Sequence, residues 1–252
     1  MENNKIKFCK FGNYGNVDWI KSAQRIDYQN SFDWMLSYVK KIQMGDAKEV
    51  IWLLEHDDIY TAGTSAKEND FKGLKNIKVL KTNRGGQWTW HGPGQRIVYF
   101  MMNLNNRKTD VRWYVNKLEQ LIIDTLEEFS ITAERREKLP GVWVKRKINS
   151  QERIDKIGAI GIRISRWIAY HGISININPD LSMYDGIVPC GITQGGVTSL
   201  ADLGIKSSMD DFDQVLAHNF ENLFDDNLKK IRDNFYTFIG IIRQFFIVII
   251  IT

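Results

Sequence analysis

Cysteine is scarce in this chain, with only Cys9 and Cys190 among 252 residues. Two thiols so far apart are weak evidence for a disulfide, and they exclude the CxxC type of zinc site. The first ten residues are polar and charged, and they lack the apolar segment of a secretory signal. The sequence therefore predicts a protein of a reducing compartment, by default the cytoplasm.

A strong charge of one sign is also missing, since the formal net charge is only +4. The one compact basic run, Lys145 to Lys147, fits a solvated hairpin or strand end better than a nucleic-acid site. A mild basic surplus still suits an acidic protein partner. We therefore expect no nucleic-acid partner.

No apolar run is long enough to span a bilayer. The dense run from Phe235 onward is interrupted by Arg243 and falls short of the ~20 residues that a transmembrane helix needs. We interpret residues 1–234 as a single domain and residues 235–252 as an atypical apolar C-terminal tail, and we expect no membrane partner.

Internal repeats and low-complexity linkers are absent, and three segments show helical spacing of apolar residues: 28–42, 111–129 and 212–223. Gly45 should end the first helix, and Ser208 with Asp211 predicts a capping box for the third. Strand patterns occupy residues 50–54, 97–104, 141–147, 156–165 and 167–178, with a tight turn expected at Ser165–Arg166. Helices and strands do not alternate strictly, which predicts an α+β domain with a mixed sheet.

The first segment with chemical character, residues 84–95, reads RGGQWTWHGPGQ. Its glycines allow close approach of the backbone to a ligand, and Arg84 and His91 add polar groups. The segment has neither the GxGxxG nor the GxxxxGK[ST] spacing of nucleotide-binding loops. It predicts a ligand-facing loop that does not bind a nucleotide.

Three further segments complete the pattern. Lys156 begins a small apolar strand, although a lysine in that position is usually solvated. His171 and Gly172 precede a strand whose alternation puts Ser174 and Asn176 on one face, either as the wall of a cleft or as a half-exposed strand. Cys190 lies between a proline and a glycine, on a turning backbone.

Cysteines are most often plain buried hydrophobes, but a thiol on such a turn is a candidate nucleophile. A reactive cysteine needs its thiolate form, and a nearby cation lowers the pKa of a thiol. Lys156, His91 and His171 are the candidate cations. Attack of Cys190 on a substrate thioester would give a new thioester that stays activated for an amine.

Together and in this order, the segments resemble the lipoyl(octanoyl) transferase family. The resemblance extends from about Glu49 to Asp202 and includes RGGxxTxHGPGQ (residues 84–95), KIxxIG (156–161), NxNPDL (176–181) and IVPCG (187–191). Trp90 stands where the family often has tyrosine. Beyond Asp202 we find little to match.

The resemblance implies a fold like that of biotin and lipoate ligase catalytic domains, a mixed β-sheet flanked by helices. It implies that Cys190 carries the acyl group and that Lys156 lowers the thiol pKa and moves protons. His56 matches a position near the site. The residues implied to bind substrate are Arg84, Gly85, Gly86, Gln87, Trp88, Thr89, Trp90, His91, Ala159, Ile160, Gly161, Gly172, Ile173 and Ser174.

The implied reaction moves octanoyl from octanoyl-acyl carrier protein to a lysine of a lipoyl domain, the first step of endogenous protein lipoylation. The acceptors would be the lipoyl domains of 2-oxoacid dehydrogenases and the glycine cleavage H protein. No metal and no other cofactor is expected. Three alternatives stay open: an ATP-dependent lipoate or biotin-type ligase, a cysteine-dependent thioester hydrolase, and a non-catalytic module that binds acyl carrier protein.

Overall fold

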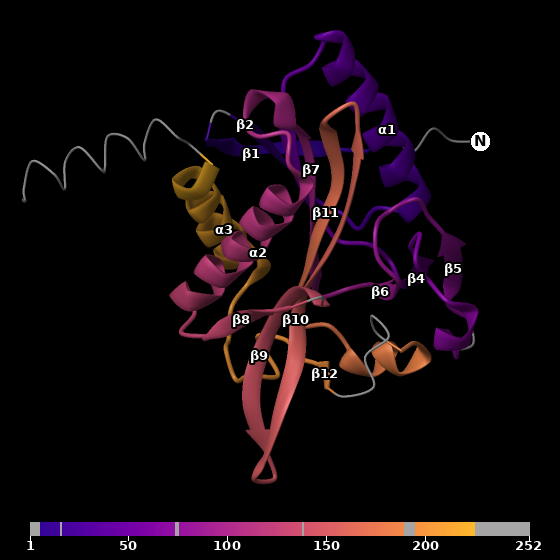
Figure 1. Cartoon of the computed structure of the whole chain (residues 1–252), viewed down its shortest axis with the longest axis vertical. Helices are drawn as coiled ribbons and strands as arrows, with labels where there is room; N and C mark the ends of the chain where they lie inside the picture. The colour runs from indigo at the N-terminus through magenta and orange to yellow at the C-terminus, as the bar shows by residue number, and fades with distance from the viewer. Residues whose placement is uncertain (1–5, 16, 74–75, 138, 189–194, 225–252) are drawn as a thin grey trace, which may run out of the picture.

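The computed structural model describes residues 6–15, 17–73, 76–137, 139–188 and 195–224 (Figure 1). The apolar tail predicted at residues 235–252 lies outside these ranges, and so does Cys190.

Within the described residues the helices are α1 (Tyr28–Met44), α2 (Val111–Glu128) and α3 (Met209–Phe224), with short 3-10 helices at Glu68–Asp70, Leu104–Asn106 and Leu181–Gly186. The strands are β1 (Phe8–Tyr14), β2 (Val17–Ser22), β3 (Val50–Leu54), β4 (Ile59–Ala62), β5 (Lys78–Lys81), β6 (Trp88–His91), β7 (Gln95–Asn103), β8 (Ala133–Arg136), β9 (Leu139–Ile148), β10 (Gln151–Ser165), β11 (Ile168–Asn176) and β12 (Gly196–Val197).

A large mixed sheet forms the body of the domain. Its strand order is β1-β2-β3-β7-β11-β10-β9-β8, and β12 pairs with β10. β2 with β3 and β10 with β12 run parallel, whereas the other pairs are antiparallel. The predicted mixed-sheet α+β fold is thereby confirmed.

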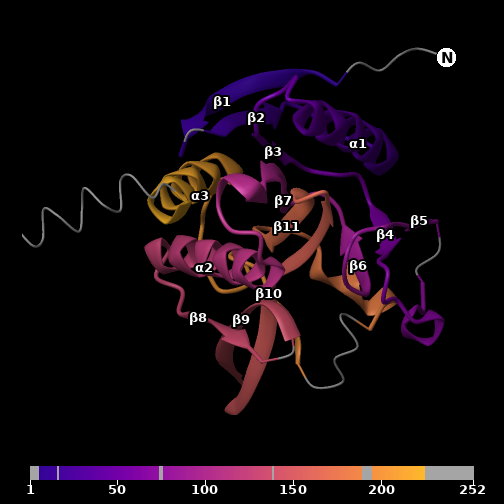
Figure 2. The same ribbon diagram turned by 45° about the horizontal axis from the view of Figure 1, so that its top comes forward.

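Helices cover both faces of this sheet (Figure 2). In β3, Ile51 and Leu53 point into the core that α2 and α3 close, while Val50, Trp52 and Leu54 point into the core beneath α1. β7 alternates in the same way. A strand buried on both faces reads as a continuous apolar run, which explains the sequence of β3. Among the described residues, no helix is both long and apolar enough to cross a membrane.

The helix ends agree with their predicted signals. Gly45 has φ of 79° and caps α1 in the left-handed conformation that glycine adopts without steric cost. At the start of α3, the Asp211 amide donates to Ser208 Oγ and the Ser208 amide donates to Asp211 Oδ2, each at 3.1 Å. This reciprocal pair is the predicted capping box.

Two successive hairpins join β9, β10 and β11, and the β9–β10 hairpin projects from the body (Figure 1). The basic run Lys145 to Lys147 lies on this hairpin, as expected. The turn before β11 is one residue later than predicted, because Ser165 pairs with Ile168 and leaves Arg166 and Trp167 as the turn. Both turn residues have positive φ, 49° and 62°, as a tight two-residue hairpin of matching twist requires.

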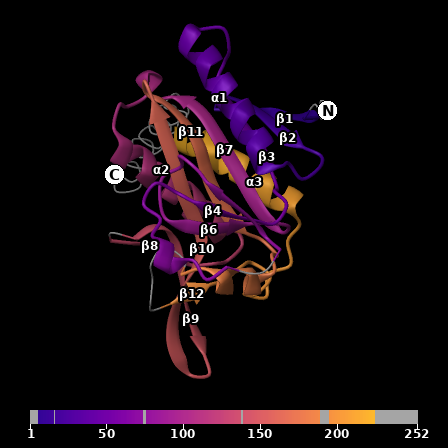
Figure 3. The ribbon, with the colours of Figure 1, turned by 90° about the vertical axis from the view of Figure 1, so that its right-hand side faces the viewer.

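A second sheet of β5, β4 and β6 lies beside β10 and β11 (Figure 3). Its outer side packs into a separate aromatic cluster that includes Tyr60, Trp88, Trp90 and Tyr184. The glycine-rich segment begins just before β6, and the Gly85 amide donates to the Ile162 carbonyl of β10 at 3.2 Å. This contact joins the two sheets where the candidate site lies.

Candidate active site

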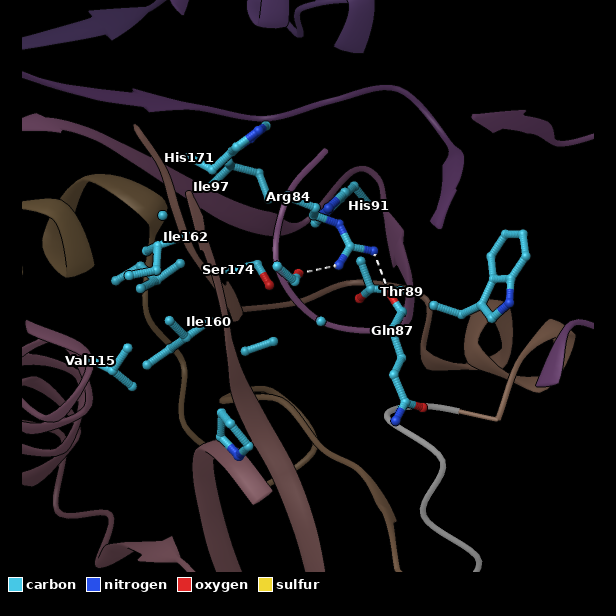
Figure 4. Close-up of a pocket in the computed structure, with 18 of the residues that line it drawn as sticks. Arg84, Gln87, Thr89, His91, Ile97, Val115, Ile160, Ile162, His171 and Ser174 are labelled. Carbon is cyan, nitrogen blue, oxygen red and sulfur yellow. Dashed lines mark hydrogen bonds between the residues drawn. The ribbon is translucent and has the colours of Figure 1, made fainter. Parts of the chain in front are cut away.

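A cavity of about 350 Å³ opens between the glycine-rich segment, β10, β11 and α2 (Figure 4). Its volume lies within the range of about 300–1,000 Å³ that is typical of small-molecule sites. Apart from Trp90, every residue predicted to bind substrate lines this cavity: residues 84–89, His91, residues 159–161 and residues 172–174. Three segments far apart in sequence thus meet at one place.

Arg84 gives the glycine-rich segment its shape. Its guanidinium donates to Thr61 Oγ1 (3.0 Å), to the Thr61 carbonyl (2.7 Å) and to the carbonyls of Gly85 (2.9 Å) and Gln87 (2.7 Å). A Cβ atom on Gly85 would lie 2.9 Å from the Ile162 carbonyl oxygen, so only glycine fits there. Arg84 therefore lines the cavity while its guanidinium ties the segment to β4.

Strand alternation in β6 separates the remaining residues of this segment. Thr89 and His91 lie on the cavity side, whereas Trp90 packs edge-on against Tyr184 with ring centroids 5.6 Å apart. Trp90 is 1% exposed and does not line the cavity. Trp90 thus packs away from the cavity that Thr89 and His91 line, and its contact with substrate stays a prediction.

Three histidines cluster at the buried side of the cavity. His91 and His171 line it, while His56 lies behind them with its ring 5.9 Å from that of His91. Burial lowers the pKa of His56 to about 4 and that of His171 to about 3, and it holds the pKa of His91 well below its ordinary value. At neutral pH all three imidazoles are uncharged.

The hydrogen bonds of these histidines fix their orientation. His56 bonds the Ile26 carbonyl through Nδ1 (2.6 Å) and the Tyr99 hydroxyl through Nε2 (2.7 Å). His91 Nδ1 lies 2.7 Å from Gln95 Oε1, and His171 Nε2 lies 3.0 Å from Asn83 Oδ1. Because the rings are neutral, they are poor candidates for the cation that activates a thiol.

The opposite side of the cavity is apolar and more open. Val115 of α2 faces Ile160 and Ile162 of β10, and all three side chains are half-buried (Figure 4). Leu139 continues this wall. The sequence patterns missed Val115 because its helical spacing marks it as an ordinary core residue; its half-exposed position shows instead that α2 contributes to the cavity.

Lys156 lies on β10 and lines the cavity, yet it is only 6% exposed. Its Nζ donates to the Pro140 carbonyl at 2.9 Å and lies 4.7 Å from the centroid of the Trp143 ring. A carbonyl oxygen and an aromatic face are both favourable neighbours for an ammonium group. A lysine at the start of a strand is usually solvated, but β10 begins five residues before Lys156 and places this residue inside the sheet.

Cys190 lies outside the described residues, but the chain on both sides of it is described. Before it, the Val188 amide donates to the Asp70 carbonyl at 2.7 Å. After it, β12 pairs in parallel with β10, so that Val197 stands opposite Lys156. Among the described residues, no group of three or more His, Cys, Asp or Glu side chains is arranged to hold a metal ion.

Residues 27–221 match the family model of the lipoyl protein ligase A/B catalytic domain. The chain belongs to this family.

Within the family the chain groups with octanoyltransferases. The octanoyltransferase of Parvibaculum lavamentivorans is 49% identical over 207 residues, covering 82% of this chain and 92% of that protein. The octanoyltransferase of Brucella melitensis is 48% identical over 215 residues, covering 82% and 81%. The predicted family, the acyltransferase class and the link with protein lipoylation are thereby confirmed.

Solved structures of lipoate ligases share the fold of this chain. Lipoate-protein ligase A bound with ATP gives a TM-score of 0.59 at 16% identity, covering 79% of this chain and 83% of the ligase. A bi-partite lipoate protein ligase from Thermoplasma acidophilum gives the same TM-score and identity, covering 79% and 82%. The predicted likeness to lipoate ligase catalytic domains is confirmed for the fold.

Proposed function

We propose that this acyltransferase moves an octanoyl group from octanoyl-acyl carrier protein, through a thioester on Cys190, to a lysine of a lipoyl domain. The acceptors would be the lipoyl domains of 2-oxoacid dehydrogenases and the glycine cleavage H protein. The observation that carries the proposal is the position of Lys156. It is a buried cation in the wall of a largely apolar cavity, and β12, which follows the Cys190 segment, pairs with the strand that bears it.

In the first half-reaction the Cys190 thiolate attacks the carbonyl carbon of the octanoyl thioester. The bond from that carbon to the carrier sulfur breaks, and the carrier thiolate takes a proton from the Lys156 ammonium. The products are octanoyl-Cys190, a free carrier thiol and a neutral Lys156. A cation beside the thiol is what allows the thiolate to exist at neutral pH.

In the second half-reaction the neutral amine of the acceptor lysine attacks octanoyl-Cys190. A carbon–nitrogen bond forms, the bond to Cys190 sulfur breaks, and the proton released by the amine passes to Lys156. The enzyme returns to its thiolate and ammonium state. Both half-reactions balance without ATP, which separates this mechanism from that of an adenylate-forming ligase.

The cavity suits the proposed acyl group. Val115, Ile160, Ile162 and Leu139 offer apolar surface to an eight-carbon chain, and burial of each methylene against such surface contributes about 0.8 kcal/mol. The buried polar side, with Ser174, Thr89 and His91, offers hydrogen-bonding groups to the carbonyl end.

Intact-protein mass spectrometry after incubation with octanoyl-acyl carrier protein tests the covalent step. We expect the mass to increase by one octanoyl group without ATP, and we expect Cys190→Ala to show no increase, whereas Cys9→Ser should behave as the wild type. Failure of the wild-type protein to gain mass would contradict the covalent mechanism. A requirement for ATP would favour the ligase alternative, and release of free octanoate with a lipoyl domain present would favour the hydrolase.

A further inference from the structure

We propose that Glu119 of α2 is a positioning residue for Lys156 and that it acts through the peptide group between Pro140 and Gly141. The inference rests on the proposed function, since it assigns a supporting residue to the lysine of that mechanism. Neither the sequence patterns nor the resemblance singled out Glu119.

Glu119 is a buried carboxylate among the mostly apolar buried residues of α2, with only 5% of its surface exposed. Its Oε1 accepts a hydrogen bond from the Gly141 amide at 3.1 Å. Its Oε2 lies 3.2 Å from Arg135 Nε. A buried carboxylate is costly unless it is paired and hydrogen-bonded, so each of these contacts offsets its loss of water.

The Gly141 amide and the Pro140 carbonyl belong to one planar peptide group. On one side of this group the N–H donates to Glu119, and on the other side the C=O accepts from Lys156 Nζ at 2.9 Å. The carboxylate and the ammonium thus hold the same peptide group from opposite ends. Its dipole aligns with both charges, so the two hydrogen bonds strengthen each other.

The peptide group lies tightly against the lysine. Gly141 has φ of 119°, and a Cβ atom there would come within 2.6 Å of the Gly158 carbonyl oxygen and 3.0 Å of Lys156 Cε. Only glycine allows this approach. The Pro140 carbonyl therefore helps to place Nζ, and the hydrogen bond from the Gly141 amide to Glu119 restrains the orientation of this carbonyl.

The Trp143 ring is a further neighbour of the Lys156 ammonium group. Its face lies 4.7 Å from Nζ, and its Nε1 donates to the Leu139 carbonyl at 3.1 Å. The start of β9 thus carries both the ring and the carbonyl that contact the ammonium. Loss of the Glu119 contact would free this segment to rotate its carbonyl away from Nζ.

The test measures how the rate of Cys190 alkylation by iodoacetamide depends on pH. A Cys9→Ser background leaves Cys190 as the only thiol in the sequence. Iodoacetamide reacts with the thiolate form, so the pH dependence of the rate shows how far a nearby cation lowers the pKa of this thiol. The variants in this background are Lys156→Ala, Glu119→Ala and Glu119→Gln. The glutamine of the last variant keeps a side-chain oxygen that can accept a hydrogen bond from the Gly141 amide. Glu128→Ala, which removes an exposed glutamate from the same helix, is the matched control.

We expect the rate at pH 7 to fall about tenfold or more in Lys156→Ala and about three- to tenfold in Glu119→Ala, with both profiles moved to higher pH. Glu119→Gln should stay within about twofold of the parent, and Glu128→Ala should match it. A residue that merely held α2 to the sheet would lower the thermal midpoint without moving the profile of the folded protein.

The outcomes separate the two proposals. A moved profile in Lys156→Ala with an unmoved profile in Glu119→Ala would overturn the role of Glu119 and leave the proposed function standing. Unmoved profiles in both variants would overturn the pairing of Lys156 with Cys190 and the inference with it. If Glu119→Ala does not fold, Glu119→Asp replaces it, since the shorter carboxylate keeps its charge but withdraws from the Gly141 amide.

Discussion

Lys156 is a charged side chain inside the sheet, and its burial is compensated by specific contacts. The Pro140 carbonyl and the Trp143 ring replace part of the water that an exposed lysine would have. Such a costly arrangement is typical of functional sites, where a charge is held at a fixed place.

Lys156→Ala should slow acylation of Cys190 by about 10²-fold or more, which is the usual contribution of a positioned acid or base. The physical reason is the loss of both the cation beside the thiolate and the proton for the leaving thiol. Rapid-quench mass spectrometry with octanoyl-acyl carrier protein measures the rate. A rate within about threefold of the wild type would contradict this role.

The three neutral histidines make stability depend on pH. The folded-state pKa of His56, about 4, and that of His171, about 3, both lie below the ordinary value of 6.5. Below about pH 6.5 the unfolded chain therefore binds protons that the folded protein does not, and each histidine lowers the free energy of unfolding by up to ~1.4 kcal/mol per pH unit. The contribution to stability is fully present above pH 6.5 and is lost as pH falls, down to about pH 4 for His56 and about pH 3 for His171.

Urea unfolding at pH 7 and pH 5 measures this slope. We expect His56→Gln to show a smaller loss between the two pH values than the wild type. His218→Gln, which changes an exposed histidine of α3, should keep the wild-type difference. An unchanged difference in His56→Gln would show that His56 takes up its proton at pH 5 in the folded protein as readily as in the unfolded chain, which would contradict its lowered pKa.

The sequence predicted most of the cavity residues because their segments carry unusual chemistry. It did not predict Tyr28, Tyr99 or Val115, which come from elements with ordinary core patterns and reach the cavity only through packing. Glu119 was missed for a related reason: in sequence, a glutamate on a helix looks like a solvated residue.

At the scale of elements, glycine positions test the packing of β11. A Cβ atom on Gly172 would lie 1.9 Å from the Val98 carbonyl oxygen of the neighbouring β7, whereas one on Gly45 would meet nothing within 4 Å. Gly45→Ala should cost only the ~1–2 kcal/mol of a left-handed conformation.

Gly172→Ala should destabilise the protein more than Gly45→Ala, because two strands must separate to admit the methyl group. Urea denaturation of both variants compares them directly. Equal free energies of unfolding would mean that β7 and β11 can shift apart at little cost.

The three helices and strands β3, β7, β9, β10 and β11 were predicted, whereas β1, β2, β8, β12 and the small sheet were not. α1, α2 and β3 have periodic or continuous apolar patterns that local sequence determines. β4, β5 and β6 form a small sheet whose strands have only four residues each, too few for a period to be recognised. The turn at Arg166 and Trp167 was placed one residue early, because neither residue type signals a positive φ.

At the scale of the whole molecule, a buried ion pair joins α3 to the sheet. Arg96 of β7 contacts Asp213 at 2.7 Å, and Lys21 of β2 contacts the same carboxylate at 2.9 Å. The side chain of Asp213 is fully buried. The capping box of Ser208 and Asp211 predicted the start of α3. No local pattern predicted that Asp213 faces inward, since Lys21 and Arg96 lie more than a hundred residues away in sequence.

Asp213→Asn should lower the free energy of unfolding by about 3–5 kcal/mol, because it leaves the Arg96 charge buried without its counter-charge. The double variant Arg96→Met with Asp213→Leu should be less destabilised, since it buries no charge. Chemical denaturation of the three proteins gives the comparison. A double variant that is less stable than Asp213→Asn would contradict this account.

The central claim is that the octanoyl group resides on this enzyme before it reaches the acceptor. The most direct measurement isolates the acylated protein, free of donor, and mixes it with an unmodified lipoyl domain in the absence of ATP, following both masses. We predict that the enzyme loses one octanoyl group at the rate at which the lipoyl domain gains it. An acylated enzyme that leaves the lipoyl domain unmodified would contradict the account.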